Sequence, residues 1–185
     1  MNPSPLLCRA DRAALLLIDI QTRLCSAMPA GIRSRVVGSA ATLAEAAARL
    51  QIPTVVTRQY PKGLGDTEAA IPTAGATVVD KLSFSCCGAP EFNTLLGSLG
   101  RPQLVIGGME SHICILQSAC DLQAAGYQVF VVEDAICSRA RANHRNAVAR
   151  MAQHGITVTN LESVLFEWLE DARHPEFKRF SSLVK

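Results

Sequence analysis

The chain has 185 residues and a formal net charge of +2, from 18 basic and 16 acidic side chains spread along its length. That length suits one α/β domain with a full core, assigned here to residues 1–185, and a second domain is not expected. The balanced charges provide no concentrated field for a polyanion or a membrane surface, so neither nucleic-acid binding nor membrane binding is predicted.

Short runs rich in Val, Ile and Leu alternate with longer, Ala-rich amphipathic stretches. In chain order, this pattern predicts a strand at 13–18, a helix at 33–50, strands at 54–57, 77–79 and 104–106, a helix at 113–125, a strand at 129–132, a helix at 141–154, a strand at 157–159 and helices at 161–169 and 175–183. Such alternation predicts a three-layer α/β/α sandwich around a mainly parallel, six-stranded, Rossmann-like sheet. The irregular stretch 59–76 carries Pro, Gly and Asp turn chemistry suited to a functional loop.

Three polar side chains follow predicted strands: Asp19, Lys81 and Cys114. In a parallel sheet the reactive crevice lies outside the carboxyl ends of the strands. Taken singly, each residue has a structural explanation, as a turn cap, a solvated strand end or a small core residue. Taken together, a carboxylate, an ammonium and a thiol form a candidate nucleophilic site, because the cation stabilises a thiolate and the carboxylate moves its proton.

The seven cysteines show no Cys-x-x-Cys spacing, and their odd number argues against a disulfide framework. The longest apolar run, at 13–18, is too short to span a bilayer, and the first residues lack a basic start with a cleavage site. A cytoplasmic protein is therefore predicted. Cys114 follows Gly107 and Gly108 at the start of a predicted helix, where the partial positive charge of the helix terminus is expected to lower the thiol pKa from about 8.5. The other six cysteines are interpreted as packed or surface residues.

Other candidate acids and bases rank lower. His112 stands two residues from Cys114, and residues two apart on a helix point to different faces, so His112 is not expected to take the thiol proton. Asp134 also follows an apolar run, but a turn or cap role is at least as well supported there. The remaining histidines, for which surface or capping roles are predicted, are His144, His154 and His174.

Several blocks in the sequence resemble the isochorismatase-like cysteine hydrolase superfamily, and the likeness runs nearly end to end. They are LIDIQ at 17–21, DKLSFS at 80–85, GGMESHIC at 107–114 and VVEDA at 131–135. The isochorismatase domain-containing proteins are the most similar subgroup, through QYPKGLG at 59–65, SVL at 163–165 and HPEFK at 174–178. The resemblance implies a catalytic triad of Asp19, Lys81 and Cys114. It also implies a cis peptide between Met109 and Glu110, with backbone N–H groups of Glu110 and Cys114 as the oxyanion hole.

Departures from the family pattern narrow the expected chemistry. Nicotinamidases carry an Asp-x-His metal cluster after the second strand, whereas residues 58–65 contain no histidine, so no metal and no cofactor is predicted. Siderophore-pathway isochorismatases open a vinyl ether without the cysteine, so Cys114 favours thiol chemistry. Four residues are candidates for lining a substrate pocket, although packing explains each equally well: Gln21, Tyr60, Phe84 and Ile115.

The function predicted from the sequence is hydrolysis of a small-molecule amide or related carbonyl compound through a thioester on Cys114. Vinyl ether hydrolysis is the alternative enzyme activity. A redox-responsive thiol or a binding scaffold on the same fold is the alternative without turnover. The apolar residues of 161–185 exceed what a short tail needs, so they either pack on the sheet or form a subunit interface. The resemblance implies a homo-oligomer.

Overall fold

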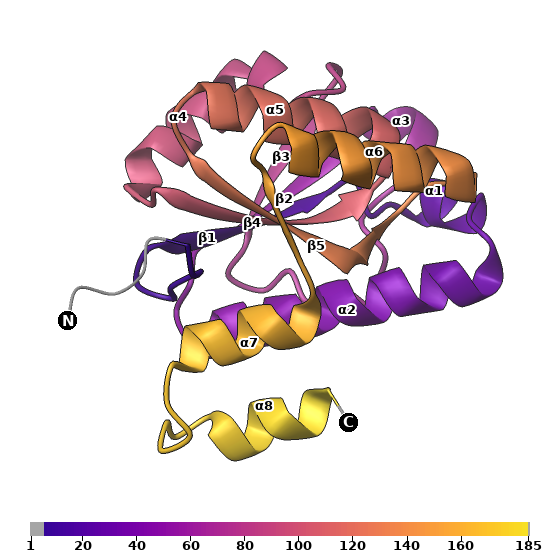
Figure 1. Ribbon diagram of the computed structural model, residues 1–185. Helices are drawn as coiled ribbons and strands as arrows, with labels where there is room; N and C mark the ends of the chain where they lie inside the picture. The colour runs from indigo at the N-terminus through magenta and orange to yellow at the C-terminus, as the bar shows by residue number, and fades with distance from the viewer. Residues whose placement is uncertain (1–5, 185) are drawn as a thin grey trace.

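A computed structural model describes residues 6–184, whose strands form one parallel sheet in the order β3-β2-β1-β4-β5-β6 (Figure 1). The strands are β1 (Ala13–Ile18), β2 (Thr54–Gln59), β3 (Thr77–Lys81), β4 (Gln103–Met109), β5 (Gln128–Cys137) and β6 (Thr157–Thr159). The predicted six-stranded α/β architecture is confirmed. Of the predicted single domain 1–185, residues 1–5 and 185 lie outside the described part.

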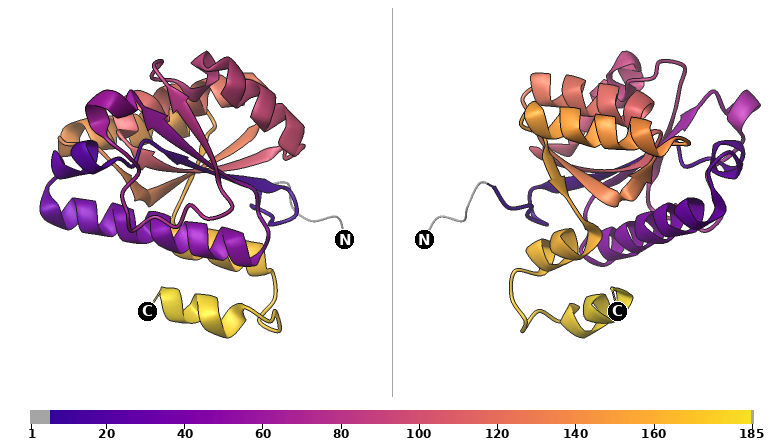
Figure 2. Two further views of the ribbon diagram at one scale, coloured as in Figure 1. Left: turned by 180° about the vertical axis from the view of Figure 1, so that it is seen from behind. Right: turned by 45° about the vertical axis from the view of Figure 1, so that its right-hand side comes forward.

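Helices cover both faces of the sheet (Figures 1 and 2). One face is covered by α2 (Ala30–Arg49) and α7 (Leu161–Leu169), with α8 (Phe177–Leu183) beyond them, and the other by α4 (Pro90–Leu99), α5 (Leu116–Ala124) and α6 (Arg141–Gln153). The short elements are α1 (Thr22–Ser26), α3 (Pro61–Leu64), the 3-10 helix η1 (Cys86–Gly88) and the π-helical turn η2 (Ser111–Ile115). No helix within residues 6–184 is both long and apolar enough to cross a membrane.

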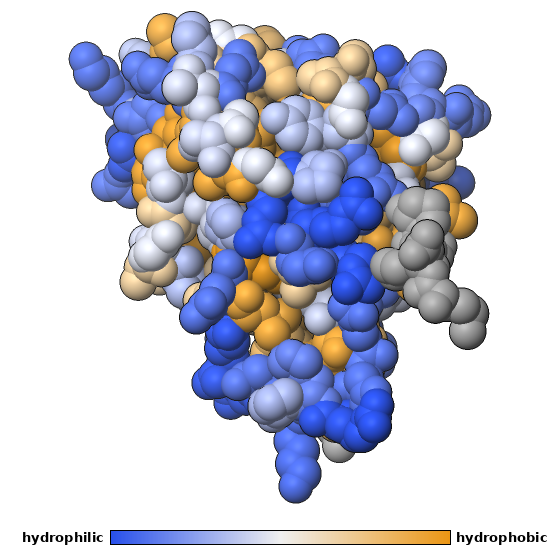
Figure 3. All heavy atoms as spheres, turned by 90° about the vertical axis from the view of Figure 1, so that its left-hand side faces the viewer, coloured by the Kyte–Doolittle hydropathy of each residue, from blue (hydrophilic) through white to orange (hydrophobic). Residues whose placement is uncertain are grey.

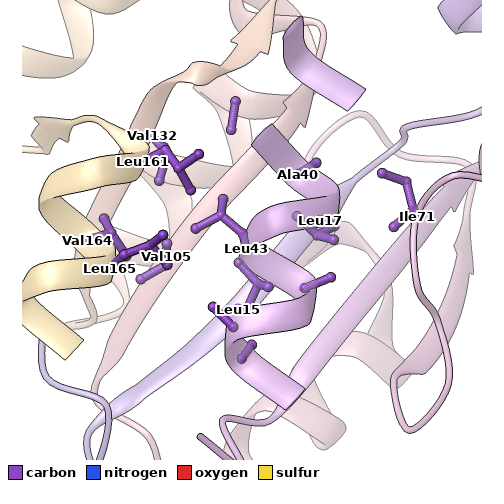
Figure 4. Packing of buried hydrophobic residues seen from close by; sticks show 14 of the residues in the cluster. Leu15, Leu17, Ala40, Leu43, Ile71, Val105, Val132, Leu161, Val164 and Leu165 are labelled. Atoms are coloured by element: carbon purple, nitrogen blue, oxygen red, sulfur yellow. The ribbon is translucent and has the colours of Figure 1, made fainter. Parts of the chain in front are cut away.

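The continuous apolar run of β1 is explained by its position in the middle of the sheet. Successive side chains of a strand point to opposite faces, and here both faces are covered, so every residue of β1 is buried. Leu15 and Leu17 lie in the cluster that includes Leu43 of α2 and Leu165 of α7 (Figure 4). Leu16 belongs to the separate cluster on the opposite face.

The apolar C-terminal residues pack on this same core. Trp168 and Phe180 are fully buried within the cluster that contains α2 and β1. The indole Nε1 of Trp168 donates a hydrogen bond to the Cys8 sulfur at 3.2 Å. Phe166 and Phe177, which are less buried, meet edge to face with ring centroids 5.9 Å apart. The sequence left two explanations for this apolar segment, packing on the sheet and a subunit interface. Packing within the chain accounts for its largest side chains.

Several elements differ from the sequence-based expectation. Helix α4 was not predicted, and α2 begins at Ala30, before the expected start at residue 33. The helix expected at 113–125 begins earlier, as the π-helical turn Ser111–Ile115, and becomes α-helical only at Leu116. Strand β5 continues through Asp134 because its register against β4 shifts between Ile106 and Gly108. Asp134 therefore lies within a strand, and its carboxylate accepts a hydrogen bond from the backbone N–H of Leu161 at 2.8 Å, which is a capping role.

Figure 3 views the end of the molecule at which the strands begin, where hydrophilic and hydrophobic residues are interspersed. At this end Arg9 forms ion pairs with Asp11 at 3.2 Å and with Glu170 at 3.0 Å. Such exposed pairs contribute little stability. The residues predicted to be catalytic follow the opposite, carboxyl ends of the strands.

Candidate active site

The carboxyl ends of β1, β3 and β4 carry Asp19, Lys81 and Cys114. Strand β1 pairs directly with β4, with Ile18 opposite Gly108, so the segments that follow these two strands are neighbours. Strand β2 lies between β1 and β3, and Lys81 reaches across its end. The exposed fractions of Asp19, Lys81 and Cys114 are 0%, 4% and 5%, so all three groups are largely removed from water.

Asp19 and Lys81 form a buried ion pair, with Lys81 Nζ 2.6 Å from Asp19 Oδ2. The other carboxylate oxygen, Oδ1, accepts a hydrogen bond from the Thr57 hydroxyl at 2.7 Å. Both oxygens of Asp19 are thus held by donors. Burying two charges is costly, and the cost is offset only when the pair has good geometry and additional hydrogen bonds, as it does here.

The ammonium of Lys81 is surrounded by acceptors. Besides Asp19, it donates to Gln59 Oε1 at 2.8 Å and to two backbone carbonyls, of Ser83 at 3.2 Å and of Phe84 at 3.1 Å. Four acceptors therefore share three N–H donors. The lysine is fixed in place as a charge beside Asp19, since its protons are already directed to groups of the protein.

The Cys114 thiol has a pKa raised to about 12, first because burial penalises the thiolate and second because the Asp19 carboxylate is close. Lys81 acts in the opposite direction but is outweighed. The sequence-based expectation of a lowered pKa at a helix start is therefore wrong. The sulfur lies inside a π-helical turn and is buried, so desolvation dominates over the helix terminus. In the resting protein Cys114 is a protonated thiol beside a carboxylate.

The raised pKa predicts how Cys114 reacts with iodoacetamide. Only the thiolate reacts, and its fraction rises about tenfold per pH unit below the pKa. The alkylation rate at Cys114 is expected to climb in this way from about pH 7 to about pH 10, measured by peptide mapping because the half-exposed Cys87 and Cys120 also react. A rate that is flat across this range would contradict the assignment, since it would indicate a thiolate already formed at neutral pH.

The backbone leading to Cys114 passes very close to β1. The peptide between Met109 and Glu110 is cis, and Gly108 has a φ of +132°. A Cβ atom at Gly108 would lie 2.0 Å from the carbonyl oxygen of Ile18, a distance that excludes any side chain. Glycine at this position lets β4 and the segment after β1 come together where Asp19 and Cys114 meet.

The sequence profile of the isochorismatase domain matches residues 13–163. The chain belongs to the isochorismatase family. It is 37% identical to isochorismatase domain-containing protein 2 of Danio rerio over 174 residues, which cover 93% of this chain and 86% of the relative. It is also 41% identical over 145 residues, 77% of this chain, to isochorismatase domain-containing protein 1 of Salmo salar, and the match spans about half of that protein, 51%.

The fold of this isochorismatase family member is shared with solved structures. The structure of a MAR1 ribonuclease from Caenorhabditis elegans superposes with a TM-score of 0.88 and 31% sequence identity, covering 96% of this chain and 92% of that one. The family membership expected from the sequence blocks is thus confirmed.

The four pocket candidates divide into two pairs. Gln21 and Ile115 are completely buried, and their assignment to a substrate pocket stays a prediction. The Gln21 amide donates to the carbonyls of Gln59 and Gly65 and accepts from the Gln59 N–H, which ties the loop after β2 to β1. Tyr60 and Phe84 are 52% and 54% exposed and remain candidates.

Three residues of the site were not identified from the sequence: Thr57, Gln59 and Cys86. Thr57 and Gln59 close β2, the strand between those carrying Asp19 and Lys81, and applying the strand-end argument to β2 would have found them. Cys86 is buried in the core cluster that contains Cys114 and adds to the increase in its pKa. His112 Nδ1 lies 2.9 Å from the Ser138 hydroxyl, and the exclusion of His112 as the base for Cys114 stays a prediction.

Proposed function

We propose that this protein is a cysteine hydrolase that cleaves a small-molecule amide or related carbonyl compound through a thioester on Cys114. The observation that carries the proposal is the buried Asp19–Lys81 pair beside a protonated thiol. A carboxylate next to a thiol is an acceptor for its proton, and a fixed cation compensates the negative charge that stays behind. A cysteine that serves only to fill the core needs neither group.

The reaction begins when Asp19 takes the proton of Cys114 as the sulfur attacks the substrate carbonyl. The oxyanion that forms is stabilised by backbone N–H groups of Glu110 and Cys114, and Lys81 balances the charge of the site. Asp19 then gives its proton to the departing amine, which leaves a thioester. Asp19 next takes a proton from water as the water attacks the thioester. The acid product is released and the Cys114 thiol is restored.

A cavity of about 290 Å³ beside Lys81 is the candidate position for part of the substrate. It adjoins the triad only at Lys81 and is lined by residues of α3, the β3 end, η1 and the start of α4: Pro61, Asp80, Lys81, Leu82, Ser83, Gly88, Ala89, Pro90 and Glu91. Near it, Tyr60, Leu82 and Phe84 expose large apolar side chains. This surface favours a compact substrate with an apolar group next to its carbonyl.

The proposal includes independence from a metal. The end of β2 carries Arg58, whose guanidinium pairs with Asp80 at 2.7 Å and with Asp66 at 2.5 Å. An arginine thus already neutralises the carboxylates in this region. Among residues 6–184, no group of three or more His, Cys, Asp or Glu side chains is placed to hold a metal ion. Homo-oligomer formation and a cytoplasmic location remain predictions.

Trapping of the thioester tests the proposal. The protein is mixed with p-nitrophenyl acetate and, separately, with a panel of small amides, and stopped samples are analysed by intact mass and peptide mapping. The expected result is an acetyl group on Cys114 itself, located by fragmentation of the modified peptide and formed faster than on the half-exposed Cys87 and Cys120. Acetylation of Cys87 and Cys120 alone, with no turnover of any amide, would contradict the proposal.

The same panel separates the alternatives. It includes an RNA oligonucleotide, because one structurally similar protein is named a ribonuclease, and a vinyl ether substrate. If a variant that lacks Cys114 cleaved the RNA or the vinyl ether, the protein would be a hydrolase that does not use a thioester. Peroxide-sensitive modification of Cys114 without any turnover would favour a redox-responsive thiol.

A further inference from the structure

Three consecutive residues before Cys114, namely Glu110, Ser111 and His112, are each bonded to one other segment of the chain. That segment runs from residue 138 to residue 144, where β5 ends and α6 begins, and it is called here the 138–144 clamp. It belongs to neither the triad nor the cavity beside Lys81. Its contacts with the turn that carries Cys114 are side-chain hydrogen bonds and an ion pair.

The first contact holds Glu110, whose peptide N–H is one of the two proposed oxyanion donors. The Glu110 carboxylate is 3% exposed, and it accepts hydrogen bonds from the Arg139 backbone N–H at 2.8 Å and from Arg139 Nε at 3.2 Å. The side chain of Arg139 is 60% exposed. A buried carboxylate is thus fixed by an arginine that the fold does not otherwise need for its core.

The second contact joins Ser111 to His144, with Ser111 Oγ 2.9 Å from His144 Nδ1. His144 Nε2 lies 3.8 Å from the Glu133 carboxylate, so these residues resemble a Ser-His-Glu triad in outline. Ser111 is completely buried, which excludes it as a nucleophile for a substrate in solution. The bond is better explained as an anchor for the turn.

The third contact involves His112 at both ring nitrogens. Its Nδ1 is 2.9 Å from the Ser138 hydroxyl, and its Nε2 is 3.3 Å from Nδ2 of Asn143. Ser138 is buried, whereas Asn143 is exposed on α6. His112, which was considered and set aside as a base for Cys114, therefore joins the turn to the end of β5 and to α6.

The turn itself departs from the regular hydrogen bonding of an α-helix. In η2 the N–H groups of Ile113 and Ile115 both donate to the same carbonyl, of Glu110, at 3.0 Å and 3.3 Å. A π-helical turn with a shared acceptor lacks the regular hydrogen-bond ladder that holds an α-helix, and such turns occur frequently at functional sites. Its geometry consequently depends on contacts from outside the turn.

We propose that Arg139 and His144 of the 138–144 clamp are positioning residues that fix the Glu110 N–H in its oxyanion-binding orientation. This inference rests on the proposed function. It separates two properties of Cys114: its nucleophilicity depends on Asp19 and Lys81, whereas stabilisation of a tetrahedral oxyanion depends on the clamp. Displacing a catalytic group by about 1 Å can lower a rate by as much as ~100-fold.

Two reagents separate these properties. Acylation by p-nitrophenyl acetate passes through an oxyanion, whereas alkylation by iodoacetamide is a direct displacement at carbon with no oxyanion. Arg139→Ala removes the guanidinium part of the first contact and keeps the bond from the backbone N–H of residue 139. For the second, His144→Asn and His144→Gln form a matched pair, because the Asn amide reaches the position of Nδ1 and the Gln amide that of Nε2. Arg145→Ala, at an exposed position of the same helix, is the control.

Arg139→Ala and His144→Gln are expected to lower Cys114 acylation by about 10- to 100-fold while alkylation stays within about twofold of the wild type. His144→Asn is expected to retain most of the acylation rate, and Arg145→Ala all of it. Thermal unfolding of each variant identifies any that does not fold, and in that case Ser111→Ala provides the test of the second contact.

Three results would overturn the inference. One is wild-type acylation in both Arg139→Ala and His144→Gln. Another is a parallel loss of acylation and alkylation in folded variants, which would mean that the clamp maintains the triad instead of the oxyanion donors. The third is equal loss in His144→Asn and His144→Gln, because the bond to Ser111 would then not carry the effect. A wild-type protein whose Cys114 is alkylated but never acylated would instead overturn the proposed function, and the inference with it.

Discussion

Replacing Cys114 with alanine is expected to abolish turnover on any amide that the wild-type protein cleaves, a loss on the order of 10⁴-fold or more. Alanine cannot form the thioester, and the Asp19–Lys81 pair cannot substitute for the missing sulfur. Cys114→Ser is expected to retain at most a trace, because the hydroxyl is a much weaker acid than the thiol beside the same carboxylate. Steady-state rates with the best substrate of the panel provide the measurement.

Cys8→Ala is the matched control for this substitution. Cys8 is also buried and its pKa is likewise raised to about 12, mainly by burial, but it contacts Trp168 at the end of the molecule where the strands begin. Its replacement removes a thiol of the same kind without touching the triad. Full turnover in Cys114→Ala would mean that another group attacks the substrate, and equal losses in both variants would point to general destabilisation.

The second large effect is expected at the buried ion pair. Asp19→Asn removes the charge that balances Lys81, and the free energy of unfolding is expected to fall by about 3–5 kcal/mol because an ammonium stays buried without a counter-charge. Lys81→Met leaves the Asp19 carboxylate in the same situation. Asp19→Asn also removes the group that transfers the proton, and Lys81→Met removes the charge that balances the site, so the turnover of both variants is expected to fall by a factor on the order of 10³ or more.

The double variant, Asp19→Asn with Lys81→Met, distinguishes the two consequences. With both charges gone, the free energy of unfolding is expected to fall by less than the sum of the two single losses. Activity is expected to stay absent. Urea unfolding of the wild type, both single variants and the double variant completes the cycle. Additive losses would show that the two side chains do not interact as a pair. Activity in Asp19→Asn would remove Asp19 from the mechanism.

The parallel, six-stranded α/β architecture was predictable because it follows from short-range patterns, and the same patterns place the candidate site residues at strand ends. The fully buried strand β1 reads as an unbroken apolar run, and the polar residue that ends it marks the reactive edge of the sheet. Lys81 and Cys114 follow their strands in the same way. Residues from three strands were therefore placed at one edge before their distances were known.

Properties that depend on packing between distant segments were not predictable. The pKa of Cys114 was expected to fall because only the helix start is visible in the sequence, whereas burial and the charge of Asp19 decide its direction. Gln21 follows β1 as closely as a ligand-binding residue would, yet its amide is bonded to the backbone of the loop after β2. Glu110 and Arg139 are 29 residues apart, and no local sequence pattern predicted the contacts between them.

The position of β1 between β2 and β4 has a consequence for the order of folding. Asp19 and Lys81 are 62 residues apart in the chain, and Cys114 follows β4, which pairs with β1 only after all the intervening elements have been synthesised. Contacts between such distant segments form late, because the loop entropy must first be overcome. The proposed acyl-transfer site therefore cannot form in a nascent chain until β1, β2, β3 and β4 have paired. The rate at which Cys114 becomes competent for acylation during refolding is expected to report the pairing of these four strands.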